Sequence, residues 1–530
     1  MVARAACTCP TSGQRRGLVR TLSAFAAMAL VFSVRGARAD EVIEDPELAA
    51  VPHETLVAPP PANGPKDTTW RASIHSRWGV DTDWDRASQD VLQGTTIASL
   101  EAEQRRSDTL MLSAGVRMRH GFAMHRNGDA RYELDVAPLS LFADVTPGAG
   151  YHVRAGYQII TMGRFDLFSA TNFLATYDLR SGPVTMAEAS AVATPSLRFD
   201  FDKVRGFTLQ AFYVPFFVPH IVSLYGSDYS LLSPLDRAHL PANIDQFRTA
   251  LEKGIGRSAL TNTGTSALQA FAPAADLRSP QGAIRATVYG SAGELSVTLG
   301  TALEPLPSPK FSPAFSAYLD SVRAGMAVPQ AQADAAIANR PIQLDHPRYE
   351  IASIDAAIDA GPIQLGAEFA YMFHRSLTGA QPGMDVGDAP MTQLEYVNMA
   401  QLGVRAEYVE GTEWAVVLES FAAIASRTPS NPAYAWIGFD GRNEYGIAAA
   451  AHFTPEKSRF KFELAGAALA VSTYMVMPRI EWEALNAFFL ELGGVFVEGT
   501  HPGPLGSHPY SLGGLYTDVD QVFVGARWSP

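Results

Sequence analysis

The strongest constraint on the fold is an alternation of apolar and polar residues that recurs along most of the chain. In one segment Tyr151, Val153 and Ala155 share a face, and His152 and Arg154 occupy the other. A period of two residues is the signature of a β-strand with one apolar face. Comparable segments lie at 110–119, 131–136, 197–202, 363–374, 401–408 and 459–464. The chain is therefore expected to be all-β.

The length of these segments favours a membrane barrel. They run for about 10 to 15 residues, near the 9 to 11 that cross a bilayer at a tilt and longer than the usual globular strand. After residue 39 the longest apolar run is Leu464–Met477, whereas a membrane helix needs about 20 residues. Such a chain can span a membrane only as a closed barrel. A secreted all-β protein, whose strands also alternate, is the alternative.

We predict a transmembrane antiparallel β-barrel of 14–16 strands over residues 70–530. The polar face carries charges of both signs, as a wet lumen tolerates, and aromatic residues recur near segment ends, where girdles form. Residues 241–253 and 313–326 are expected to form short loop helices, either on the surface or as a plug. Long connections, which such barrels place outside the cell, lie at 163–194, 218–281, 304–346, 376–392 and 426–440.

The first 39 residues are predicted to be a signal peptide. An arginine-rich front without acids precedes an apolar core at Leu22–Val34, and Ala37 and Ala39 mark a cleavage site before Asp40. Residues 40–69 are acidic and proline-rich, and we expect them to be disordered. Export followed by barrel assembly places the protein in the cell outer membrane, with lipid as its surroundings.

Composition narrows the function. Cys7 and Cys9 lie in the predicted signal peptide, so the mature chain has no disulfide and no thiol site. Cleavage also removes six arginines, which leaves 35 basic and 54 acidic residues and a net charge of −19. This charge argues against nucleic acid as a partner and predicts mild cation selectivity for a channel.

Motifs for catalysis, cofactors and metals are missing from the sequence. It has no Gly-x-Ser-x-Gly turn, no phosphate loop and no His-Glu-x-x-His. Asp81, Asp83 and Asp85 begin like a calcium loop, but Arg86 stands where glycine is needed and Leu92 where glutamate is needed. We expect no cofactor, no metal and no enzymatic activity.

Between residues 155 and 183 the chain carries a series of glycines, side-chain amides and charged residues whose order forms a recognisable pattern. Its members are Gly156, Gln158, Gly163, Asp166, Asn172, Asp178 and Arg180. The stretch resembles a family of proteobacterial porin-like outer-membrane β-barrel proteins of unassigned function, with the pattern Gly-x-Gln, Trp-Gly, Asp and Asn-Pro-x-Asp. Met162 replaces the tryptophan, and residues 174–177 replace the Asn-Pro. The resemblance implies a barrel with an ordered loop after this strand, and it implies no reaction and no solute.

The loop after this strand carries opposite charges, which suggests a pore constriction. The residues predicted to line it are Arg164, Asp166, Asp178 and Arg180. The residues predicted to form the lumen wall beside it are Arg154, Gln158, Arg198 and Asp200. If the loop folds inward, these charges would impose a transverse field and a size limit. If it projects outward, they are simply solvated.

These features predict an outer-membrane porin-like channel for passive or selective passage of small solutes. Two alternatives stay open. One is a surface-interaction or adhesion barrel whose lumen is plugged by residues 218–281 or 304–346. The other is a barrel enzyme that acts on lipid. Neither the solute nor the oligomeric state follows from the sequence.

Overall fold

The computed structural model describes most of the chain from Thr68 onward. The described residues are 68–82, 90–125, 130–163, 165, 169–180, 191–221, 279–306, 308–323, 326, 328–338, 342–380, 392–411, 413–432, 435–436, 439–469, 473–499 and 520–529. The predicted signal peptide, nearly all of the predicted acidic lead and the predicted helix at 241–253 lie outside them.

Eighteen long strands form one antiparallel sheet. In chain order they are β1 (Thr68–Asp81), β2 (Asp90–Ser107), β3 (Leu110–His125), β4 (Ala130–Gly148), β5 (Tyr151–Gln158), β8 (Thr194–Phe201), β9 (Phe207–Val214), β10 (Gln281–Tyr289), β11 (Gly293–Leu303), β14 (Arg348–Ala360), β15 (Ile363–Ala380), β16 (Thr392–Glu410), β17 (Trp414–Ala425), β19 (Asn443–Phe453), β20 (Phe460–Leu469), β21 (Thr473–Leu485), β22 (Phe488–Gly499) and β23 (Gln521–Trp528).

Shorter elements lie in the connections. β6 (Thr176–Tyr177) pairs with β7 (Ala191–Val192), and β12 (Ser308–Phe311) pairs with β13 (Ile342–Asp345). β18 (Ala435–Trp436) pairs with the end of β15. The described helices are α6 (Pro313–Arg323) and α7 (Gln330–Ala338).

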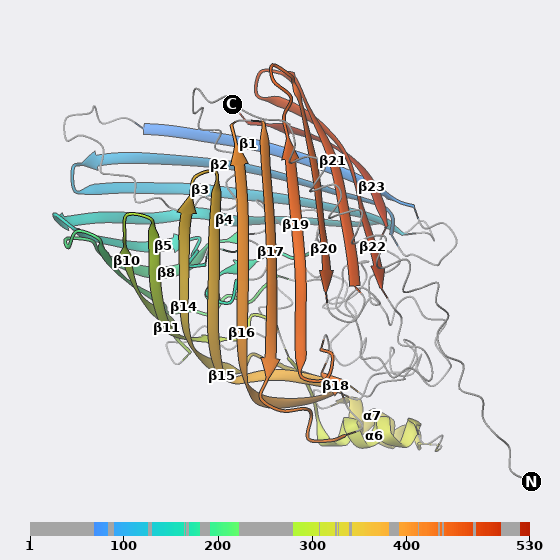
Figure 1. The fold of residues 1–530 in the computed structure, drawn as a ribbon. Coiled ribbons are helices and arrows are strands. Elements are labelled where there is room, and N and C mark those ends of the chain that lie inside the picture. The colour runs from blue at the N-terminus through green and yellow to red at the C-terminus, as the bar shows by residue number, and fades with distance from the viewer. Residues whose placement is uncertain are drawn as a thin grey trace, which may run out of the picture. The chain divides into compact units, whose positions relative to one another are not determined.

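The sheet closes on itself because the first strand pairs with both the second and the last. β1 runs antiparallel to β2 from Thr68 to Val80, and antiparallel to β23 from Ile74 to Asp81. Every other long strand pairs with two antiparallel neighbours in the same way (Figure 1). This arrangement confirms the predicted all-β antiparallel barrel.

The eighteen strands exceed the 14–16 that the sequence suggested. The apolar run Leu464–Met477 includes the end of β20 and the start of β21, and β1, at the start of the predicted barrel, pairs with β23. β2 alternates weakly because its outward positions are small: Gly94, Ala98 and Ala102 stand opposite outward-facing residues of β1. Small residues on the lipid face weaken the hydrophobic signal without weakening the strand.

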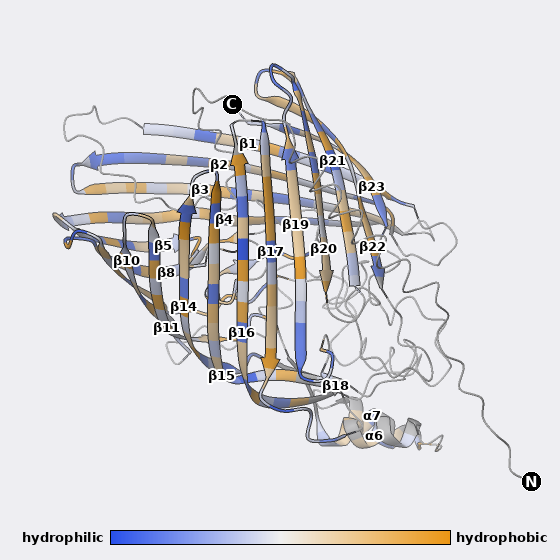
Figure 2. Cartoon of the chain, in the orientation of Figure 1, coloured by the Kyte–Doolittle hydropathy of each residue, from blue (hydrophilic) through white to orange (hydrophobic). Residues whose placement is uncertain are grey.

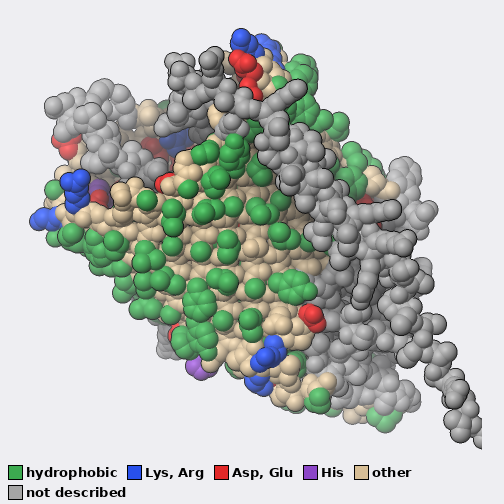
Figure 3. Space-filling view, viewed as in Figure 1, with side chains coloured by type: hydrophobic (Ala, Val, Ile, Leu, Met, Phe, Trp, Pro, Cys, Tyr) green, Lys and Arg blue, Asp and Glu red, His purple; other side chains and the backbone are tan. Residues whose placement is uncertain are grey.

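The outward face of the barrel wall is apolar. Leu134 of β4 is 66% exposed, whereas its neighbour Asp135 points inward and contacts Arg180. Hydropathy alternates along the strands in Figure 2, and apolar side chains cover the visible wall in Figure 3. Trp78 lies 5.6 Å from Phe122 between ring centroids, as part of an outward aromatic row. An apolar surface of this extent is suited to lipid and not to water.

The helices lie in the connection between β11 and β14, beyond the strand ends (Figure 1). The helix predicted at 313–326 is present as α6 and ends at Arg323. Phe315 is buried in α6, and its ring centroid lies 6.2 Å from that of Tyr318, while Met326 is exposed. Among the described residues, no helix is both long and apolar enough to cross a membrane.

Candidate functional site

The connection after β5 folds into the barrel. Its first limb contacts inward-facing residues of β11, β15 and β16, and its returning limb contacts β3 and β4. In the closed sheet β4 and β15 are separated by many strands in either direction. The connection therefore crosses the lumen, which answers the question that the sequence left open. We call the described residues between 159 and 180 the crossing loop.

The tip of the crossing loop is held by Glu368, an inward-facing residue of β15. The Glu368 carboxylate accepts hydrogen bonds from Ser169 Oγ and Thr171 Oγ1, each at 3.1 Å, and from the Ala170 N–H at 3.2 Å. Glu368 is only 2% exposed. Because an unpaired buried carboxylate is strongly unfavourable, wall and loop stabilise each other at this point.

Two wall glycines leave room for aromatic residues of the loop. A Cβ on Gly300 of β11 would lie 2.4 Å from Cζ of Phe173, and a Cβ on Gly403 of β16 would lie 3.3 Å from Cε1 of Phe165. The first distance is a steric overlap, so any larger residue at Gly300 must push Phe173 away. Gly300 therefore sets how closely the crossing loop approaches the wall.

Apolar side chains pack the crossing loop against part of the inner wall. Ile160, Met162 and Leu174 of the loop are all buried. They share one cluster with residues of β9 to β17, which we call the apolar wall: Phe212, Val214, Ala283, Ala302, Tyr349, Ile351, Ala370, Met372, Val397, Met399, Ala423 and Ala425. This apolar burial stabilises the loop against the wall, in the way that core packing holds a helix in place.

The returning limb ends in an ion-pair network. Arg180 contacts Asp135 of β4, and its Nε and Nη2 donate to the Asp178 carboxylate at 2.9 and 2.7 Å. Arg119 of β3 lies 3.8 Å from Asp178 and donates to Glu133 at 3.1 Å. Burial by itself raises the pKa of Asp178, but the hydrogen bonds and charge of Arg180, with Arg119, outweigh it and lower that pKa. The network is therefore charged at neutral pH.

A second segment, which follows β9, joins the returning limb. The N–H of Ile221 donates to the carbonyl of Tyr177 at 2.9 Å, and the N–H of Tyr177 donates to Nδ1 of His220 at 3.3 Å. Burial, followed by the charges of His346 and Arg375, lowers the pKa of His220 to about 4. The ring is neutral at pH 7 and can accept this hydrogen bond.

Two of the four predicted constriction residues, Asp178 and Arg180, come together inside the barrel in the ion-pair network. The other two, Arg164 and Asp166, lie outside the described residues. Sequence reasoning did not find the three wall residues that complete the network, Arg119, Glu133 and Asp135. They belong to alternating segments of β3 and β4, but their pairing with a distant loop has no local signature.

The four predicted lumen-wall residues lie on β5 and β8. Arg154 pairs with Asp144 at 3.0 Å, Arg198 pairs with Asp200 at 2.9 Å, and Gln158 donates to a β8 carbonyl at 3.3 Å. Arg154 and Arg198 are also register partners. These residues are held by the wall itself, and their role beside a solute path stays a prediction.

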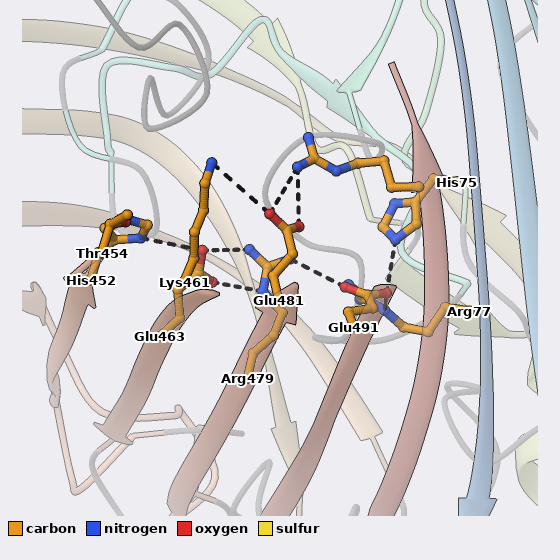
Figure 4. Close-up of polar contacts among 10 residues, drawn as sticks. His75, Arg77, His452, Thr454, Lys461, Glu463, Arg479, Glu481 and Glu491 are labelled. Carbon is orange, nitrogen blue, oxygen red and sulfur yellow. Dashed lines mark hydrogen bonds and ion pairs between the residues drawn. The ribbon is translucent and has the colours of Figure 1, made fainter. Parts of the chain in front are cut away.

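The inner face of β1 and β19 to β23 carries many charges (Figure 4). The exposed fraction of its side chains runs from 3% at Glu491 to 33% at Glu463, so this face is partly solvated. We call it the charged wall, and its members are His75, Arg77, His452, Lys461, Glu463, Arg479, Glu481, Glu491 and Arg527.

Glu491 connects the charged wall across the closure of the barrel. It lies on β22, but its carboxylate accepts hydrogen bonds from Nε and Nη2 of Arg77 on β1, at 2.7 and 2.9 Å. Nε2 of His75, also on β1, lies 2.9 Å away. Glu491 passes over β23 at Gly525, where a Cβ would lie 2.1 Å from its Oε1. The glycine is needed for this reach.

Sequence reasoning placed Glu368, Lys461 and Glu463 on polar strand faces but did not single them out. Alternation marks every inward-facing residue in the same way, so it cannot pick out these three. The hydrogen bond from Ser169 to Glu368 also joins positions 199 residues apart, which no local pattern reveals. Within the part of the chain that the structure describes, no three His, Cys, Asp or Glu side chains gather to hold a metal ion.

Comparison with solved structures finds outer-membrane porins of proteobacteria. OpdK of Pseudomonas aeruginosa with vanillate is 9% identical, with a TM-score of 0.44 over 88% of this chain and 98% of that chain. OmpF of Salmonella typhi in complex with daunomycin is 12% identical, with a TM-score of 0.40 over 87% and 97%. OprB of Pseudomonas putida is 8% identical, with a TM-score of 0.40 over 88% and 94%. No protein-family model and no curated protein matches the sequence.

Proposed function

We propose that this protein is an outer-membrane porin-like channel that passes small hydrophilic solutes. The crossing loop is the observation that carries the proposal. It enters the lumen and is held at its tip by Glu368 and at its returning end by Asp135, and the same barrel carries the partly solvated charged wall. A loop fixed at both ends inside a wet barrel sets a size limit for solutes.

The outer membrane suits both faces of the barrel. The apolar exterior is stable in lipid, and closure leaves no unpaired strand edge in the bilayer. The charged interior needs water along the barrel axis. The predicted signal peptide supplies the export that this location requires.

Conductance of the mature chain in planar bilayers tests the channel. We expect stepwise currents from wild type, and larger, noisier currents from Glu368→Ala, because the loop tip loses its acceptor. Glu350→Ala is the matched control: it lies on the adjacent strand β14 with a side chain 54% exposed, and should leave conductance unchanged. Heat-modifiable gel mobility reports folding. Folded wild type and folded Glu368→Ala that both gave no current would refute the channel.

A plugged surface-interaction barrel is the second candidate, and the tight apolar seating of the crossing loop favours it. Most of one predicted plug, at 218–281, lies outside the described residues. A folded, current-free barrel that binds a surface would support this candidate.

We further propose that the protein is no lipid hydrolase, so purified protein should release no fatty acid from phospholipid vesicles.

A further inference from the structure

We infer that the outward face of β1, β2 and β3 is a contact surface for a second copy of this chain within the membrane. The inference goes beyond the proposed channel function and does not depend on it, because a barrel can associate whether or not it conducts. It is carried by a row of polar side chains that points out of the barrel, toward the lipid. We call this surface the outer patch, and its members are Ser76, Gly94, Thr96, Ala98, Ala102 and His120.

The polar row crosses three adjacent strands (Figure 1). Ser76 of β1 is the register partner of Thr96 on β2, and Thr96 is the register partner of His120 on β3. Residues two positions apart on a strand share a face, and here they are exposed apolar side chains. Ile74 and Met118, for example, are 46% and 42% exposed. The polar row therefore lies inside the apolar band of the wall.

His120 is the member of the row that lipid tolerates least. Its side chain is half-buried beside Tyr132, and within the described part of the chain its imidazole makes no hydrogen bond. Ser76 Oγ and Thr96 Oγ1, by contrast, lie 2.8 Å apart and bond each other. Glu350 also faces outward, but it is the third residue of β14 and stands near the end of the wall. Because an ionisable side chain in hydrocarbon is unfavourable without a polar partner, His120 indicates a contact with protein.

Small side chains allow another wall to approach the polar row closely. Gly94 and Ala98 flank Thr96 on β2, and Ala102 follows on the same face. Trp78 lies across Gly94, where a Cβ would be 2.5 Å from its Cε3. The indole can lie against the wall here only because this position is a glycine. Small residues at membrane contacts bring two backbones together and put polar side chains within hydrogen-bond reach.

A second copy is the occupant that fits the polar row at its depth. Copies in one membrane share orientation and depth, so rotation about the membrane normal brings their outer patches together at one height. The row then offers both hydroxyl acceptors and an imidazole donor. Lipid chains have no polar atom at this depth. Headgroups lie beyond the aromatic row of Trp78, Phe122 and Tyr132, which marks the interface.

Native mass spectrometry of the mature protein in mild detergent, with chemical cross-linking in lipid vesicles, tests the inference. We expect wild type to form a defined oligomer. His120→Leu removes the group that needs a partner, and Ala98→Trp prevents close approach. Each should weaken association about tenfold, the scale of one or two hydrogen bonds in a membrane. Ala449→Trp is the matched control and should associate like wild type, because its outward register partners are the apolar Leu418 and Gly466.

Folding does not obscure the result, since His120→Leu makes the lipid face more apolar and heat-modifiable mobility identifies folded protein. A wild type that stays monomeric in vesicles overturns the inference, as does an oligomer that persists in both patch variants. Equal weakening by Ala449→Trp overturns it too, because the contact would then not depend on the polar row. A monomer that retains phosphorylated lipid, and loses it in His120→Leu, would assign the outer patch to lipid instead.

Discussion

The interior of the barrel has two unlike walls. On the apolar wall, Ala370 and Ala425 are 0% exposed and Met372 is 2% exposed, and they share one buried cluster with residues of the crossing loop. On the charged wall, the side chains of Lys461 and Arg479 are 21% and 29% exposed. Both walls consist of inward-facing residues of one sheet. An inward position therefore does not by itself require a polar residue. Whether the position contacts water or a packed loop determines whether a polar or an apolar residue is stable there.

The two walls should respond differently to substitution. The apolar wall is packed like the core of a soluble domain, where a new charge has no partner and the loop must move. The charged wall already contains solvated ions and can accommodate another. Changes on the first wall should appear as lost stability and a displaced loop, and changes on the second as altered selectivity.

The same substitution placed on each wall gives the largest contrast. Ala370→Arg buries an unpaired charge under the crossing loop and should cost about 3–5 kcal/mol, with increased conductance. Ala465→Arg, two residues from Glu463 on the same face of β20, should leave stability nearly unchanged. Thermal unfolding by gel mobility, with conductance, measures both. Equal losses in the two variants would contradict the distinction between the walls.

A third surface, the lipid face, should be less tolerant than the charged wall. Leu134 points outward from β4 at 66% exposure. Leu134→Arg should cost about 2–4 kcal/mol near the middle of the membrane, whereas Leu134→Phe should be nearly neutral. Folding titrations into lipid vesicles measure the difference. If both variants fold equally well, the outward face does not contact lipid.

The contrast between the walls also explains which strands could be predicted from the sequence and why the course of the crossing loop could not. β4, β5 and β20 were predictable because charged residues such as Arg154 and Lys461 alternate there with apolar ones. β15 was also predicted, at 363–374, where Gln364 and Glu368 alternate with apolar residues, although Ala370 and Met372 point inward and are as apolar as their outward neighbours. The inward course of the crossing loop depends on Glu368, and its hydroxyl donors are ordinary loop residues.

Acid should weaken the contact between the crossing loop and the segment after β9, because it protonates His220. Its folded pKa of about 4 lies below the ordinary value of about 6.5, so the folded state binds fewer protons between these values. The stabilisation is complete above about pH 6.5 and is lost as pH falls toward 4, by about 3 kcal/mol in total. Wild type should lose more stability than His220→Gln over this range. Hydrogen exchange of the Tyr177 amide measures it, and parallel pH profiles would contradict it.

The smallest expected effect comes from Asp135→Asn, at the end of the crossing loop. This change removes one charge facing Arg180, but Asp178 and Glu133 remain within reach of that guanidinium at 2.7 and 3.6 Å. We therefore expect a loss of about 1 kcal/mol and a modest rise in current noise, since the returning limb is held less firmly. Asp144→Asn is the matched control on the same strand, because Asp144 pairs with Arg154 and not with the loop. It should lose a comparable ion pair without changing the noise. If both variants alter the current equally, the ion-pair network supports the wall and does not position the crossing loop.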